Sequence, residues 1–145
     1  LTMKKMKSCS ILIAAILVPA LFTELDGVFG QANEPAKNEN ESSKSIHYLQ
    51  NARNLLNQTS VEYNNKNYTG AEELATGAYL DNFEYVEHVL EQKGSDSMVK
   101  NIEHLMREEL RDLIKNKANQ TELDKNIEVT DAKLLDAINL LNGVK

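Results

Sequence analysis

The sequence has no tryptophan, one cysteine and two prolines among its 145 residues, and its 16 basic side chains are outnumbered by 22 acidic ones. Phosphate binding needs a basic face, so a net charge of −6 disfavours a nucleic-acid partner. No apolar stretch reaches the roughly 20 residues of a membrane-spanning helix. With 41% hydrophobic and 26% charged residues, the composition is that of a globular protein. The length fits a single domain.

The N-terminal stretch has the features of an export signal. Met3 to Lys7 is lysine-rich, Ile11 to Phe22 is apolar, and Gly30-Gln31-Ala32 has the small-x-small pattern of a cleavage site. We therefore expect residues 1–32 to be a signal peptide, and the mature chain to be periplasmic, extracellular or on the cell surface. Cys9 would leave with the signal, which excludes disulfides, thiol catalysis and thiolate zinc sites from the mature chain.

The rest of the chain divides into a polar spacer and four amphipathic stretches. Residues 33–42 have alanine as their only apolar side chain, which predicts a flexible spacer. Apolar side chains then recur at helical spacing, with short polar breaks between the stretches. The stretches cover residues 43–64, 70–92, 96–116 and 121–142. This pattern predicts an all-α fold, an antiparallel four-helix bundle over residues 43–145 that folds without a metal.

The breaks contain typical helix-terminal residues. Thr69-Gly70-Ala71-Glu72 has the pattern of a capping box, which predicts Thr69 as the N-cap of the second helix. Gly94 and Gly143 stand where left-handed residues end helices. Gly77 lies inside the second predicted helix, where glycine is unfavourable, and this indicates a close helix crossing.

Carboxylates and histidines crowd the second and third predicted helices, which raises the possibility of metal or acid-base chemistry. A helical wheel places His47, His88 and His104 on outward faces, so the three histidines do not converge. The chain also contains no Glu-x-x-His, a motif that ferritin-like di-metal enzymes require on two helices. A ferritin-like di-metal enzyme is therefore disfavoured.

Two carboxylates fall on inward faces of the wheel, Glu87 in the second helix and Glu109 in the third. A buried carboxylate needs a partner, a raised pKa or a metal, because burying its charge alone is costly. The candidate partners are an arginine or a tyrosine hydroxyl, and they include Arg53, Arg107 and Arg111. Structural pairing and metal binding are both open at this point.

The run from Ala78 to Glu87, Ala-Tyr-Leu-Asp-Asn-Phe-Glu-Tyr-Val-Glu, is followed by Ile102-Glu103 and Leu110-Arg111. This order resembles the helical extracytoplasmic domain that precedes the membrane helices of prokaryotic iron permeases, in which A-Y-x-x-x-F-E-x-x-E is followed by Ile-Glu and an arginine. The resemblance covers about residues 43–115. The family's Arg-Glu-x-x-Glu iron motifs do not occur in this sequence, and Leu110-Arg111 is displaced by one residue, so permease activity is not carried over.

The resemblance implies an accessory domain of iron uptake whose partner is a membrane iron permease or another envelope protein. It singles out Glu84, Glu87 and Glu103 as metal ligands. Carboxylates suit iron and other oxygen-preferring cations, and Glu84 and Glu87 are spaced i, i+3, so they can approach one ion from one helix face. The resemblance therefore predicts weak cation binding by these three residues.

The alternative is a metal-free envelope interaction module, which could be glycosylated. Acceptor sequons begin at Asn40, Asn57, Asn67 and Asn119, the last three at or near predicted helix ends. The sequence contains no nucleophile-base pair, phosphate loop, haem motif or nucleotide fingerprint. We therefore expect the protein not to be an enzyme.

Overall fold

The structure is a computed structural model that describes the backbone of residues 36–144 and the side chains of residues 41–144. It contains the helices α1 (Ala36–Asn64), α2 (Tyr68–Ala78), α3 (Glu84–Gln92), α4 (Asp96–Glu103), α5 (Leu110–Lys115) and α6 (Gln120–Leu141), and the π-helical turns η1 (Tyr79–Phe83) and η2 (His104–Glu109). Because η1 and η2 join their neighbours without a break, the elements form four helical segments. The described part has no strand, which confirms the predicted all-α class.

The first helix begins earlier than predicted. Its first residue, Ala36, lies inside the stretch 33–42 that the sequence analysis assigned to a flexible spacer. Glutamate, lysine and alanine in this stretch are good helix formers, and extending an existing helix is far easier than starting one. The predicted signal peptide, residues 1–32, and the first residues of the spacer lie outside the described residues.

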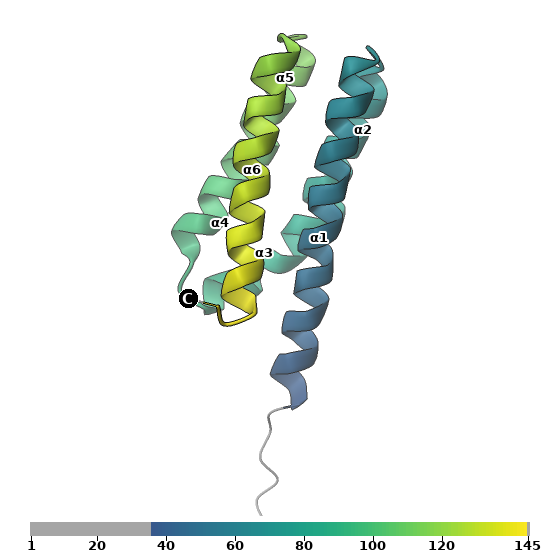
Figure 1. Ribbon diagram of the computed structural model, residues 1–145. Helices are drawn as coiled ribbons and strands as arrows, with labels where there is room; N and C mark the ends of the chain where they lie inside the picture. The colour runs from purple at the N-terminus through teal and green to yellow at the C-terminus, as the bar shows by residue number, and fades with distance from the viewer. Residues whose placement is uncertain (1–35, 145) are drawn as a thin grey trace, which may run out of the picture. The chain divides into compact units, whose positions relative to one another are not determined.

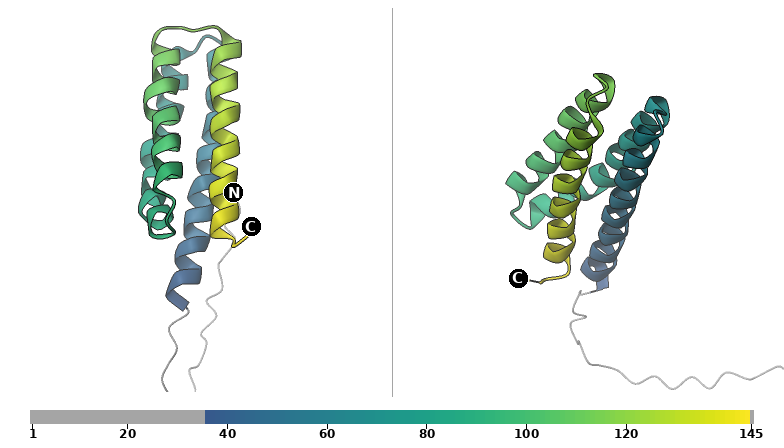
Figure 2. Two further views of the ribbon diagram at one scale, coloured as in Figure 1. Left: turned by 90° about the vertical axis from the view of Figure 1, so that its left-hand side faces the viewer. Right: turned by 45° about the horizontal axis from the view of Figure 1, so that its top comes forward.

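Each of the four segments packs against its neighbours in the chain, and the first also packs against the last (Figure 1). Helix α1 contacts α2, η1 and α3 on one side and α6 on another. Helix α4, η2 and α5 contact α6, while α2 contacts α5 and α3 contacts α4. The two views of Figure 2 show the same segments side by side. None of the helices in the described part combines the length and apolar character needed to cross a bilayer.

The core is built from the predicted apolar stripes. Each segment contributes side chains with no solvent exposure, among them Leu49, Leu56, Phe83, Leu90, Ile102, Met106, Leu123 and Leu134. Within each segment these side chains are four, seven or eleven residues apart, spacings that put them on one face of the helix. The positions of most core residues were therefore predicted correctly from the apolar periodicity of the sequence.

The turn between α1 and α2 differs from the predicted capping box. Asn67, not Thr69, is the N-cap, and its side chain accepts a hydrogen bond of 3.1 Å from the backbone N–H of Gly70. Asparagine is at least as good an N-cap as threonine, and it stands two residues earlier, so helix α2 starts at Tyr68. The predicted left-handed residues at the other ends are confirmed, with φ of 75° at Gly94 and 71° at Gly143.

The π-helical turns were not predicted, and they change which side chains share a face. The N–H of Glu84 donates to the carbonyl of Tyr79, and that of Leu110 donates to the carbonyl of Leu105, five residues back in both cases. Each turn thus contains one residue more than an α-helical turn. Residues beyond the turn are rotated by roughly 100° from the positions of a continuous α-helix.

Gly77 does not mark the predicted close helix crossing. A Cβ atom at this position would lie 3.9 Å from a methyl carbon of Leu55 in α1 and 3.4 Å from a carboxylate oxygen of Asp81, which are ordinary contacts. The Gly77 carbonyl accepts a hydrogen bond of 2.9 Å from the side-chain amide of Asn82. Asn82 is buried at the π-helical turn, and this bond gives its side-chain amide a hydrogen-bond partner.

Candidate functional site

Glu87, the inward carboxylate of the second segment, contacts a buried tyrosine. The Tyr79 hydroxyl donates a hydrogen bond of 3.1 Å to Glu87 Oε1. The two residues are eight positions apart, which would turn them by about 80° from one another on a regular α-helix. Turn η1 lies between them and absorbs one residue, so the separation corresponds to about two turns of 3.6 residues. A tyrosine hydroxyl was one of the partners that the sequence analysis offered for this carboxylate.

The surroundings of Glu87 disfavour its charge. Burial raises the pKa of Glu87 above its usual value, and the hydrogen bond from Tyr79 works in the opposite direction. The carboxylates of Glu103, Glu84 and Glu91 raise the pKa of Glu87 further. Glu87 is therefore a partly buried acid in a cluster of like charges, and the donor that contacts it is the neutral hydroxyl of Tyr79.

Tyr79 is held in its protonated, donating form. It is 7% exposed, and burial together with the neighbouring Glu87 charge and hydrogen bond raises the pKa of Tyr79 to about 12. Glu103 raises the pKa of Tyr79 as well, whereas Arg107 lowers it. The hydroxyl is thus available to hold Glu87 at any physiological pH.

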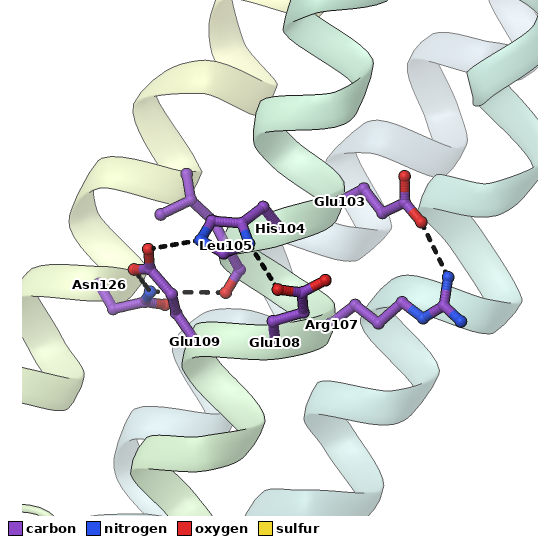
Figure 3. Close-up of polar contacts among 7 residues, drawn as sticks. All are labelled: Glu103, His104, Leu105, Arg107, Glu108, Glu109 and Asn126. Atoms are coloured by element: carbon purple, nitrogen blue, oxygen red, sulfur yellow. Dashed lines mark hydrogen bonds and ion pairs between the residues drawn. The ribbon is translucent and has the colours of Figure 1, made fainter.

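Glu103 is paired within its own segment. Arg107 Nη1 donates a hydrogen bond of 2.8 Å to Glu103 Oε1, one turn away, as drawn in Figure 3. The hydrogen bond to Glu103 is the main cause of a raised pKa at Arg107, and the nearby Tyr79 hydroxyl adds to it. Because the Arg107 side chain is 56% exposed, this ion pair contributes little to stability.

The three predicted ligands thus have different surroundings. Glu84 is exposed, Glu87 is held by Tyr79, and Glu103 is paired with Arg107. Among the side chains of residues 41–144, no three or more histidine, cysteine or acidic groups are arranged to hold a metal ion. The charges of Glu84 and Glu103 act on Glu87, but the three carboxylates would have to move before one cation could contact them together.

Comparisons of the chain with protein-family models, with curated proteins and with solved structures found no match. The resemblance of residues 43–115 to the iron-permease domain therefore stays a prediction that depends on the motif residues.

The prediction that Glu109 points inward is wrong. Its side chain is 48% exposed, and Oε1 lies 3.1 Å from His104 Nε2 while Oε2 accepts a hydrogen bond of 3.3 Å from the Asn126 amide (Figure 3). The helical wheel assumed 100° per residue, whereas Glu109 ends the π-helical turn η2. In that turn, residues five apart come together, so Glu109 meets His104 at the helix surface.

The histidines do not converge, in agreement with the prediction. His47 lies 3.3 Å from the Asn51 amide, and His88 lies 2.8 Å from that of Gln92, so both contact their own helices. His104 Nδ1 is 2.8 Å from Glu108.

Arg53, one of the partners considered for the inward carboxylates, instead joins the first helix to the last. Its guanidinium forms a two-pronged contact with Asp131 of α6, at 2.7 and 2.9 Å.

Asn126 of α6 was missed by the sequence analysis. It is 7% exposed, and its Oδ1 atom is the buried side-chain oxygen that has no hydrogen-bond partner within the described residues. Its place in the sequence carries a signal, because it lies three residues after Leu123 and four before Thr130, both fully buried. A polar side chain in an apolar stripe requires a partner or a role.

Two of the four sequon asparagines are helix caps. Asn67 caps α2, and Asn119 caps α6 by accepting a hydrogen bond of 3.0 Å from the backbone N–H of Glu122. Asn57 is exposed inside α1, away from the helix end expected for it. The fourth, Asn40, belongs to the first turns of α1.

Proposed function

We propose that this chain is an exported helical accessory domain of iron uptake, folded as an antiparallel four-helix bundle, that binds an oxygen-preferring cation weakly through Glu84, Glu87 and Glu103. The observation that supports this function is the position of Glu87, a partly buried carboxylate whose pKa is raised first by burial and then by the charges of Glu103 and Glu84. A carboxylate whose ionisation is opposed by neighbouring carboxylates gains from a cation, which lowers the free energy of its charged form.

Arg107 sets the affinity in this proposal. It neutralises Glu103 in the absence of a metal, so a cation has to displace the guanidinium before Glu103 can act as a ligand. Tyr79 keeps one oxygen of Glu87 in place and leaves the other oxygen for the ion. Iron, manganese and calcium all accept such oxygen donors. A membrane iron permease or another envelope protein would receive the cation.

Calorimetric titration of the purified chain with Fe(III)-citrate, Mn²⁺ and Ca²⁺ tests the proposal. We expect a weak, saturable heat with at least one of these ions, and tighter binding as the pH rises from 4 to 7, because the ligands must lose their protons. Glu87→Gln should weaken binding by about tenfold or more. Glu128→Gln, which neutralises an exposed carboxylate of α6, is the matched control and should bind like the wild type.

Arg107→Gln separates cation binding from structural pairing. It frees Glu103 from its internal partner, so the affinity for the cation should rise by about tenfold or more. If no ion binds to the wild type or to Arg107→Gln, and if Glu87→Gln also costs several kcal/mol of stability, Glu87 is a structural partner of Tyr79 and the proposed function is wrong.

A further inference from the structure

A cavity of about 250 Å³ lies between the third and fourth helical segments, away from the proposed cation site. Leu105 and Leu113 line it from one side, and Val129 of α6 lines it from the other. Val129 is 41% exposed, so an apolar side chain that could be packed is left open to the cavity. The lining is thus able to hold an apolar group of a few carbon atoms.

Asn126 adds a polar group to this lining. Its amide nitrogen donates to the backbone carbonyl of Leu105 at 3.4 Å and to Glu109 Oε2 at 3.3 Å, while Oδ1 has no partner among the residues that the structure describes (Figure 3). Turning the amide over would place Oδ1 against those same two acceptors, so the oxygen is without a donor in both orientations. Buried acceptors without a donor are rare in proteins, and a bound water, ion or other molecule is one of the ways in which they are satisfied.

The amide can adjust to a ligand. Both of its hydrogen bonds are longer than the usual range of about 2.7–3.2 Å and are therefore weak, so a small rotation costs little. Glu109 is held on its other oxygen by His104 at 3.1 Å and remains close to the amide. A donor that enters the cavity can therefore reach an amide oxygen and a carboxylate oxygen together.

The charges of the lining select the ligand class. The lining contains two carboxylates, Glu109 and Glu122, and one ammonium group, Lys125. Negative charge is therefore in excess around the cavity. We propose that this cavity binds a small organic ammonium ion. Its N–H groups donate to Asn126 Oδ1 and to the Glu109 carboxylate, and its short apolar chain packs against Leu105, Leu113 and Val129. A bare metal ion would leave this apolar lining unused, and an anion would meet the carboxylates.

NMR titration of the ¹⁵N-labelled chain with n-hexylammonium, 1-hexanol and hexanoate tests this inference. We expect saturable shifts at Asn126, Leu113 and Val129 with n-hexylammonium, and at least tenfold weaker binding of the two other probes. Equal binding of the alcohol would show that only the apolar lining matters and would overturn the ammonium class. The absence of saturable shifts with n-hexylammonium would overturn the site.

Two variants test whether the ammonium ion contacts Asn126 and Glu109. Asn126→Leu keeps the size of the side chain but removes the acceptor, and Glu109→Gln removes the charge while keeping a hydrogen-bonding group. Each should weaken n-hexylammonium binding by about tenfold or more, whereas Glu128→Gln on the same helix should not change it. Wild-type affinity in Glu109→Gln would refute the charge contact even if Asn126→Leu failed to fold. Glu87→Gln should also leave binding unchanged, which distinguishes this site from the cation site.

Discussion

Replacing Tyr79 with phenylalanine removes the hydroxyl that donates to Glu87 and leaves the packing of the ring in place. Hydrogen bonds to charged groups contribute about 1.5–3 kcal/mol and neutral ones about 0.5–1.5 kcal/mol. Because the Glu87 side chain is only partly buried, we expect the lower part of the first range. Tyr79→Phe should therefore cost about 1.5–2 kcal/mol at pH 8, where Glu87 is charged, and about 0.5–1 kcal/mol at pH 4.

The direction of this pH dependence follows from Glu87. Its pKa is raised in the folded state, so its favourable contribution is fully present below the unfolded pKa and is lost as the pH rises through the folded pKa. The Tyr79 hydroxyl lowers the pKa of Glu87, which limits that loss. Without the hydroxyl, the pKa of Glu87 rises further and the loss becomes larger.

Urea unfolding followed by far-UV circular dichroism at pH 4 to 8 measures the effect. Tyr63→Phe is the matched control, because the Tyr63 hydroxyl donates to the neutral carbonyl of Ala118 at 2.6 Å and its loss should cost about 1 kcal/mol at each pH. In a Glu87→Gln background, Tyr79→Phe should lose its pH dependence. A cost for Tyr79→Phe that is the same at pH 4 and pH 8 would refute the charge-dependent contact.

Three further predictions concern the helices and can be checked by the same unfolding measurements. Gly94→Ala should cost about 1 kcal/mol because φ is 75°, whereas Gly77→Ala, in a helix with room for a Cβ, should stabilise by up to about 1 kcal/mol. Phe83→Ala should cost about 3–5 kcal/mol because the ring is fully buried, and Tyr85→Ala, 63% exposed, should cost under about 1 kcal/mol. Asn119→Ala should cost about 1 kcal/mol by loss of the cap of α6, and Asn119→Asp should retain most of it. A reversed order within any of these comparisons would contradict the corresponding structural interpretation.

The helices and most of the core could be predicted because burial of one face imposes a period near 3.6 residues on the sequence. Phe83 and Leu134, both fully buried, stand in such stripes. The early start of α1 at Ala36 could not be predicted in this way, since that stretch has no apolar stripe and is helical through propensity and propagation.

The candidate site was predicted in part. Periodicity placed Glu87 inward and allowed a tyrosine as its partner, but it could not identify Tyr79, because the extra residue of η1 brings the two closer to one line along the segment. The same kind of turn, η2, moved Glu109 from the core face to the surface beside His104. A π-helical turn depends on how neighbouring helices pack, so a wheel with a fixed angle per residue cannot reveal it.

The two capping asparagines differ in what an attached sugar would cost. An N-linked glycan bonds to Nδ2 and leaves Oδ1, the capping atom, available as an acceptor. At Asn67, Nδ2 donates a hydrogen bond of 2.6 Å to Glu62 and lies close to Gly70, so a glycan would break a contact that ties the turn to α1. At Asn119, only Oδ1 forms a hydrogen bond with the described residues, and the cap of α6 is compatible with a sugar. If the chain is exported and meets a glycosylating enzyme after folding, Asn119 is the capping asparagine that can be modified without weakening its helix.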